Sequence, residues 1–227
     1  MIYVISDIHW NINELEKLIQ LLNINKEDTL IFLWDYIDKW LETEKTLRYL
    51  LYLDTNYSVI FLKGNHEYVW EQYLIFWDTT RQDFLLKYWW IESLKLYELW
   101  VELLYNNDIG RLKIILGNYI HIIEKTIDFY VVNNYLLIHA WLLENQLEDK
   151  NISLTERNFF LRLSDINLNK KYLNKYTIVA GHNAHKSPII SNWYIWIDLW
   201  SAYNWAIWCL CIEENKIISS QWEIFYI

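Results

Sequence analysis

Three short apolar runs alternate with two amphipathic segments at the start of this chain, and this order constrains the fold more than any other feature. The runs have strand length and end abruptly in polar residues: IYVISD at 2–7, TLIFLWD at 29–35 and SVIFLKGN at 58–65. Between the first two lies NINELEKLIQLLN, with apolar residues on one helical face, and ETEKTLRYLLYLD precedes the third with a similar pattern. The β-α-β-α-β order predicts parallel strands joined by right-handed crossovers.

The rest of the chain extends this α/β pattern. Residues from about 68 to 105 are rich in Leu, Tyr and Trp and predict a mostly helical segment, which we expect to shape substrate choice. Later strands are predicted at YLLIHA, YTIVAGH, YIWID, AIWCLCIE and KIISSQ. The chain shows no repeat, linker or low-complexity tract, so we expect residues 1–227 to form a single α/β domain.

Charge and apolar patterning exclude several classes of partner. The chain carries 20 Lys+Arg against 29 Asp+Glu, a net charge of −9, so it lacks the basic balance that broad nucleic-acid or anionic-membrane binding needs. No apolar run approaches the length of a membrane span. The start MIYVISD has no basic region and reaches Asp7 early, so we expect no signal peptide. We expect the protein to be cytoplasmic and monomeric. Cys209 and Cys211 alternate within an apolar run, which predicts two reduced, buried thiols rather than a disulfide.

Polar side chains gather at the ends of five predicted strands. Each strand end delivers at least one His, Asp or Asn: Asp7 and His9, then Asp35 and Asp38, then Asn65 with His66 and Glu67, then His139, and finally His182. A single His or Asp at such a place is more often structural or a helix cap. Ligands of open α/β sheets bind at the carboxyl ends of strands, however, and five coincident strand ends favour a shared site there.

The chemistry of these groups is that of a metal centre. Imidazole, carboxylate and amide oxygen together, without thiolate, suit divalent ions such as Mn²⁺, Fe²⁺ or Zn²⁺. Six such ligands, one of them a shareable carboxylate, suit two ions about 3.5–4 Å apart, as in enzymes that displace phosphoryl groups in line.

The motifs D-I-H-x-N, x-D-Y-I-D-K-x, K-G-N-H-E, H-A-x and G-H-x-x-H resemble those of the calcineurin-like metallophosphoesterases, and most closely the bacterial phosphoprotein phosphatase branch. Relatives in that branch include symmetrical diadenosine tetraphosphate hydrolases. The resemblance runs from Ile2 to about Glu213. It implies a central β-sandwich flanked by helices, with a two-metal site at the strand ends.

The resemblance also implies roles for individual residues. Asp7 and His9 would bind the first metal and Asp35 would bridge both, while the second metal would be held by Asn65, His139 and His182. His66 would be the general acid that protonates the leaving oxygen, with Asp38 orienting its imidazole. The two ions are expected to be Mn²⁺, with Fe or Zn as alternatives.

Other polar residues of these segments are less sharply defined. Lys39 stands where the family usually has Arg; Lys keeps the positive charge but cannot form the bidentate contact of a guanidinium. Arg162 in FFLRLSD loosely matches a family segment whose Arg binds the substrate phosphate. Both are candidate phosphate-binding residues; for Lys39 the alternative is a solvated surface cation. The role of His185 stays open. His121 is expected on a strand face, and Glu67 is expected to support its turn or cap the next helix.

Tryptophan replaces glycine at the family's glycine positions. The chain has 4 Gly and 15 Trp, whereas average usage would give roughly 16 Gly at this length. Motif positions with Trp are Trp10, Trp34, Trp40 and Trp141, and Trp89, Trp90, Trp196, Trp200 and Trp205 also lie where glycine is natural. Glycine permits positive φ and close backbone approach, and Trp does neither. Because some bacteria read UGA as glycine and a common alternative table reads it as Trp, we expect these residues to be glycines in the natural protein. Trp70, in a predicted helix, is expected to be genuine.

The favoured function is therefore a two-metal phosphoester hydrolase of the serine/threonine protein phosphatase type, acting on phosphorylated protein. A dinucleoside polyphosphate hydrolase, acting on diadenosine tetraphosphate, uses the same core and is the alternative enzyme. A non-catalytic binding protein remains the alternative from another class, if the motif tryptophans are genuine and obstruct the site.

Overall fold

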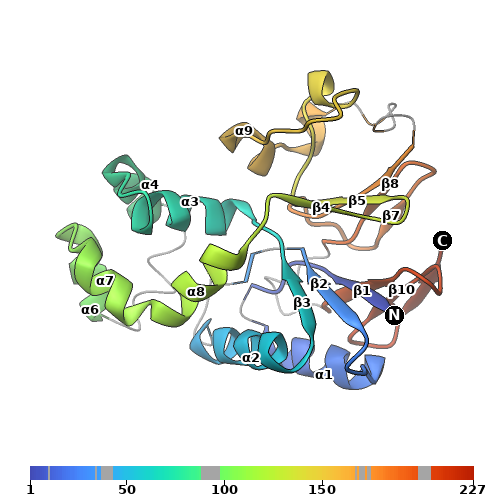
Figure 1. Ribbon diagram of the computed structural model, residues 1–227, viewed down its shortest axis with the longest axis horizontal. Coiled ribbons are helices and arrows are strands. Elements are labelled where there is room, and N and C mark those ends of the chain that lie inside the picture. Colours follow the sequence, from blue (N-terminus) through green and yellow to red (C-terminus); the bar gives the residue numbers. More distant parts are fainter. Residues whose placement is uncertain are drawn as a thin grey trace.

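The computed structural model describes residues 1–9, 11–33, 35–36, 43–87, 98–166, 168, 172, 175–198 and 206–227. Within these residues, two β-sheets lie face to face with helices outside them (Figure 1). One sheet has the order β11-β10-β9-β1-β2-β3, with β1 Ile2–Ile5, β2 Thr29–Phe32, β3 Ser58–Phe61, β9 Trp208–Cys211, β10 Lys216–Ser219 and β11 Ile224–Tyr226. The other has the order β4-β5-β6-β8-β7, with β4 Phe129–Val132, β5 Tyr135–Ile138, β6 Thr177–Ala180, β7 Ile189–Ile190 and β8 Tyr194–Trp196.

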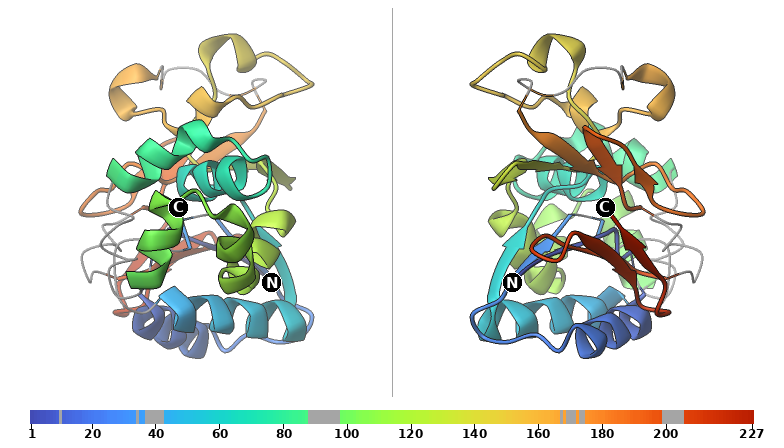
Figure 2. Two further views of the ribbon diagram at one scale, coloured as in Figure 1. Left: turned by 90° about the vertical axis from the view of Figure 1, so that its left-hand side faces the viewer. Right: turned by 90° about the vertical axis from the view of Figure 1, so that its right-hand side faces the viewer.

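The helices are distributed over three places around the sandwich. Their bounds are α1 Ile12–Leu22, α2 Thr43–Asn56, α3 Asn65–Leu74, α4 Gln82–Lys87, α6 Glu98–Tyr105, α7 Ile109–Ile115, α8 Gly117–Lys125 and α9 Glu156–Phe159, with 3₁₀ turns η1 Thr79–Arg81, η2 Glu144–Gln146 and η3 Leu163–Asp165. Helices α1 and α2 run along the outer side of the six-stranded sheet, and α9 lies beyond the five-stranded sheet (Figures 1 and 2). Helices α3, α4, α6, α7 and α8 gather at one end of the sandwich (Figure 1).

The parallel β-α-β-α-β unit is confirmed. Strand β1 pairs with β2 and β2 with β3, both in parallel, with Ile2 opposite Thr29 and Thr29 opposite Ser58. In the second sheet β5, β6 and β8 are also parallel. The predicted strands at the C-terminal end are confirmed as β9 and β10, which pair antiparallel. Strands β4, β7 and β11 lie at sheet edges and were not predicted.

Alternation along the strands builds three apolar layers. Val4 faces the layer between the sheets, whereas Tyr3 and Ile5 face the layer under α1 and α2. Cys209 and Cys211 are free, buried thiols in that helix-side layer, as predicted. The third layer lies on the outer side of the second sheet and includes Trp141 and Trp196. Two stacked sheets with helices outside therefore match the expected β-sandwich.

The expectation for His121 was wrong. His121 lies exposed on helix α8, not on a strand. The β-branched neighbours in YIHIIEK favour a strand in local preference, but Tyr119, Ile120, Ile122 and Ile123 are the buried residues of the helix. Tertiary packing therefore outweighs the local signal. In the part of the chain described, no helix has the length and apolarity needed to cross a membrane.

Candidate metal centre

The loops that follow the parallel strands carry the polar residues expected from the sequence. His9 follows β1, Asp35 follows β2, and Asn65 and His66 open helix α3 directly after β3. His139 follows β5 in the second sheet, and His182 follows β6. Because parallel strands end at the same edge of a sheet, the topology brings these segments together between the two sheets.

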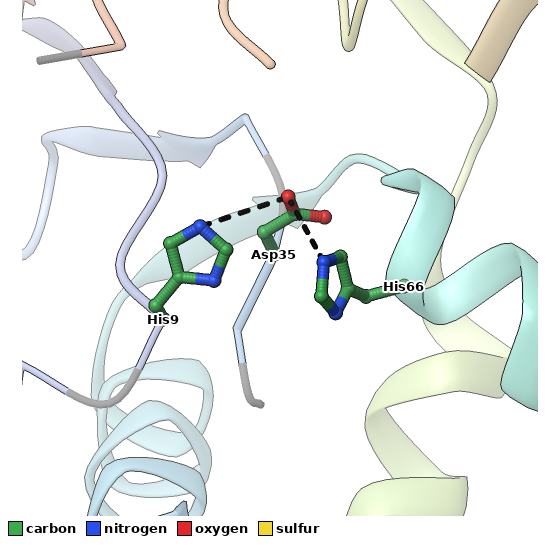
Figure 3. Close-up of side chains that lie close together, drawn as sticks. All are labelled: His9, Asp35 and His66. Carbon is green, nitrogen blue, oxygen red and sulfur yellow. Dashed lines mark ion pairs between the residues drawn. The ribbon is translucent and has the colours of Figure 1, made fainter. Parts of the chain in front are cut away.

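One cluster joins the first three loops. His9, Asp35 and His66 each offer a ligand atom within 4.8 Å of the others, and all three are buried. The imidazole Nε2 atoms of His9 and His66 both lie 3.8 Å from Asp35 Oδ2. Figure 3 shows the two rings directed at this one carboxylate from opposite sides.

A second cluster lies on the other side of Asp35. Asp35, His139 and His182 offer ligand atoms within 4.8 Å of one another. His139 Nε2 lies 4.0 Å from Asp35 Oδ1, so the two carboxylate oxygens of Asp35 face the two clusters separately. This is the arrangement that a bridging carboxylate requires.

The spacing within the second cluster fits a metal ion. His139 Nε2 lies 2.8 Å from Asn65 Oδ1 and 3.0 Å from His182 Nδ1. The single hydrogen that Nε2 can carry can be donated to only one of these two lone pairs. Ligand atoms about 2.1 Å from one ion and at right angles to each other lie about 3 Å apart. A divalent ion among Asn65, His139 and His182 would satisfy all three ligand atoms.

Three members of these clusters hold the backbone in the left-handed region. The φ angles are 42° at His9, 47° at Asp35 and 62° at His182. Non-glycine residues rarely adopt this region, and such strain gathers at functional sites where the surroundings enforce it. One enforcing contact is the hydrogen bond of 2.7 Å from the His9 N–H to the Asp35 carbonyl, which joins the first two loops.

Glu67 stabilises the loop after β2 and the start of helix α3 by hydrogen bonds, as predicted. Its carboxylate is fully buried and accepts hydrogen bonds of 3.1 Å from the backbone N–H groups of Asp35, Tyr36 and Gly64. These bonds tie the loop after β2 to the start of helix α3, so they hold Asp35 beside Asn65 and His66.

The electrostatic setting favours the neutral form of the His139 imidazole. Burial lowers the pKa of the His139 imidazole well below its usual range, and the nearby positive charges of three other histidines and Arg162 lower it further. A metal ligand must present a lone pair, so a depressed pKa favours metal binding over protonation.

The remaining predicted site residues divide into three groups. Asp7 is buried two residues after the end of β1 and belongs to neither of the two clusters around Asp35. Asp38 and Lys39 lie outside the described residues. Arg162 is exposed. His185, whose role the sequence left open, is partly buried, and its backbone N–H donates to the Asp198 carbonyl at 3.0 Å.

Residues 1–206 match the family model of the calcineurin-like phosphoesterases. The chain belongs to this family. The family depends on two metal ions, and the two clusters around Asp35 are candidate groups for holding them. Membership supports hydrolysis of phosphoesters as the activity of this calcineurin-like phosphoesterase.

Solved structures with the same fold belong to several phosphatases. A protein assigned as a diadenosine tetraphosphatase is 16% identical with a TM-score of 0.61, over 96% of this chain and 91% of that chain. A cold-active protein-tyrosine phosphatase of a Shewanella species is 15% identical with a TM-score of 0.59, over 96% and 76%. A serine/threonine phosphatase from Saccharomyces cerevisiae is 13% identical with a TM-score of 0.52, over 100% and 79%. No curated protein sequence matches this chain significantly.

Proposed function

We propose that this calcineurin-like phosphoesterase is a two-metal phosphomonoesterase of the serine/threonine protein phosphatase type. The observation that carries the proposal is the position of Asp35, whose two oxygens face two separate groups of imidazoles: His9 and His66 at Oδ2, and His139 at Oδ1. When bound, a pair of divalent ions would supply the positive charge that activates a water molecule and neutralises phosphoryl oxygens. Mn²⁺ is the metal we propose, with Fe or Zn as alternatives.

Within this proposal the protein's own residues divide the remaining work. Asp7 and His9 hold the first ion, and Asn65, His139 and His182 hold the second. His66 protonates the leaving oxygen, because its imidazole lies beside the shared carboxylate at 3.8 Å and is nearly fully buried. An alkoxide leaves poorly without a proton, and a positioned acid typically contributes about 10²–10⁴-fold. Asp38 orients His66, and Arg162 and Lys39 bind the phosphate.

A cavity lined by segments that follow His139 in the chain favours a peptide over a polyphosphate. It begins at Leu142, three residues after His139, and continues through Arg157 and Ser164 on either side of Arg162. Its lining carries the carboxylates of Glu144, Glu148 and Asp165 and the guanidinium of Arg157, together with apolar side chains. Negative charge would attract basic residues next to a phosphoserine and repel the extra phosphates of a dinucleotide.

The competing substrate is diadenosine tetraphosphate, as the structural likeness to a protein assigned as its hydrolase suggests. The discriminating experiment measures kcat/KM of the Mn²⁺-loaded protein on a phosphoserine peptide with flanking Arg residues and on diadenosine tetraphosphate. We expect the peptide to be preferred. A strong preference for the dinucleotide would replace the first proposal with the second, and hydrolysis of neither would favour a non-catalytic binding protein.

We also propose that the natural protein carries glycine where this sequence has tryptophan at the loop positions. Among the described residues, the nine non-glycine residues with positive φ comprise three of the candidate ligands, four Asn, and Trp77 and Trp222. Asn tolerates this region, but a bulky side chain there is an outlier. No described glycine has positive φ, and a Cβ at Gly117 would meet nothing within 4 Å.

The local structure at both tryptophans is one that glycine normally provides. Trp77 lies two residues after Ile75, the C-cap of helix α3, and is left-handed; a left-handed residue just past a helix end is commonly glycine. Trp222 closes the β10–β11 hairpin, where its N–H donates to the Ser219 carbonyl at 3.1 Å and the Ser219 N–H donates to the Glu223 carbonyl at 2.9 Å. A turn followed by a left-handed residue is the three-residue hairpin that favours glycine there.

Near the centre, Trp141 and Trp196 support the same conclusion. They stack with ring centroids 5.2 Å apart and are almost completely buried. Neither indole N–H finds an acceptor among the described residues, although buried indoles usually do. Reading the gene tests the proposal: UGA codons at Trp77, Trp141, Trp196 and Trp222, with UGG at Trp70 and Trp208, support it. UGG at all fifteen tryptophans would refute it.

A further inference from the structure

Asn183 makes a pair of hydrogen bonds that no expectation from the sequence assigned. It follows His182 directly, and its side chain is largely buried. Its amide Nδ2 donates to the carbonyl of Leu161 at 3.2 Å, and its Oδ1 accepts from the N–H of Leu163 at 3.3 Å. Leu161 and Leu163 flank Arg162, so the Asn183 side chain is hydrogen-bonded to the backbone on both sides of Arg162.

The segment around Arg162 has little other regular structure. Helix α9 ends at Phe159 and the 3₁₀ turn η3 begins at Leu163, which leaves Arg162 in the connection between them. The Arg162 N–H donates to Asp165 Oδ2 at 3.2 Å, and its carbonyl accepts from the Asp165 N–H at 2.8 Å. Asp165 therefore fixes the residue to its own turn, and Asn183 fixes the turn to the core of the protein.

The other end of this link is the loop of a candidate metal ligand. The Asn183 N–H donates to the Gly181 carbonyl at 2.6 Å, which closes a three-residue γ-turn with His182 at its centre and φ of 62°. Because the turn is strained, the directions of His182 and Asn183 are strongly determined together. The Gly181 N–H also donates to the His139 carbonyl at 2.9 Å, which joins this turn to the loop that carries His139, another candidate ligand.

We propose that Asn183 is a positioning residue that places the Arg162 guanidinium over the metal centre, so that the second metal and the phosphate-binding arginine are held by one turn. The inference rests on the proposed function, in which Arg162 binds the substrate phosphate. A phosphate between an ion and a guanidinium must meet both at fixed separation, and a free surface loop would not maintain it.

The test is a double-mutant cycle in the Mn²⁺-loaded protein with glycine at positions 10, 34, 40 and 141. The variants are Asn183→Ala, Arg162→Ala and both together, and the readouts are inhibition by inorganic phosphate, KM and kcat on the phosphopeptide, and bound metal per chain. Asn158→Ala is the matched control, because Asn158 is also buried and donates to the Trp141 carbonyl. Among the described residues, its hydrogen bonds go to Trp141, Gln146 and Thr155 and not to Leu161 or Leu163.

We expect Asn183→Ala to weaken phosphate inhibition about fivefold to tenfold and to raise KM more than it lowers kcat, with bound metal unchanged. Arg162→Ala should weaken it further, since bonds to charged groups are the stronger ones, and adding Asn183→Ala should then cost little more. Asn158→Ala should leave phosphate inhibition near the parent value. Asn183→Asp keeps the acceptor for the Leu163 N–H and should be intermediate, which serves if Asn183→Ala does not fold.

Three results would overturn the inference. One is unchanged phosphate inhibition in Asn183→Ala and Asn183→Asp. Another is an equal effect of Asn183→Ala with and without Arg162, which would mean that it does not act through Arg162. The third is loss of bound metal in Asn183→Ala, which would mean that Asn183 positions His182 and not Arg162. If the parent hydrolyses no phosphoester, the proposed function fails, whereas the affinity of the same variants for inorganic phosphate, measured directly by calorimetry, still tests the role of Asn183.

Discussion

Replacing Trp77 and Trp222 with glycine should stabilise the chain as written. A non-glycine residue in the left-handed region costs about 1–2 kcal/mol, and glycine adds about 0.4–1 kcal/mol of freedom to the unfolded chain. The side chains are 57% and 74% exposed, so removing the indoles forfeits little burial. The net gain is about 0.5–1 kcal/mol at each position. At about 2–4 °C per kcal/mol for a chain of this size, the double variant should melt about 2–8 °C higher.

The assay is thermal unfolding followed by circular dichroism, with urea unfolding as a second measure. Trp208→Gly is the control, because Trp208 is buried in strand β9 and its ring packs 5.4 Å from that of Phe225. Loss of such a core aromatic costs about 3–5 kcal/mol, so the control should melt far lower. A Trp77→Gly/Trp222→Gly variant that melts below its parent would refute the strain argument and weaken the case for glycine in the natural protein.

Two further predictions concern the site itself. Glu67→Gln should lower the free energy of unfolding by about 1–3 kcal/mol in urea titrations, because a buried acceptor of three backbone N–H groups loses its charge; an unchanged midpoint would contradict its supporting role. His66→Asn should keep the bound metal and lose about 10²–10⁴-fold in rate on alkyl phosphates, with a smaller loss on p-nitrophenyl phosphate, whose phenolate leaves without a proton. Asp38→Asn should show a weaker form of that pattern, and equal losses of His66→Asn on both substrates would argue against an acid role.

Strand order and ligand candidates were accessible from the sequence because both depend on local patterns. Apolar runs of strand length that end in His, Asp or Asn identify β1, β2, β3, β5 and β6, together with the residues that meet beside Asp35. Helix α8 was not accessible, because its β-branched residues favour a strand and only packing against the core decides otherwise.

The backbone strain at the centre was also beyond sequence reasoning. The positive φ of Asp35 is held by contacts to distant segments, namely the His9 N–H and the Glu67 carboxylate. The hydrogen bonds of Asn183 to the residues beside Arg162 join positions about twenty residues apart in the chain. Such contacts leave no local pattern, because each partner is an ordinary polar residue until the fold brings it to the other.

The most direct test of the two-metal centre is the number of Mn²⁺ ions bound per chain at equilibrium, measured by elemental analysis on the protein with glycine at positions 10, 34, 40 and 141. Asp35→Asn is the paired variant, because Asp35 is the residue that the two clusters share among the described parts of the chain. We expect two ions in the parent and a loss of bound metal in Asp35→Asn, with the His66→Asn variant retaining both ions. Fewer than two ions in the parent, or two retained in Asp35→Asn, would contradict a centre bridged by Asp35.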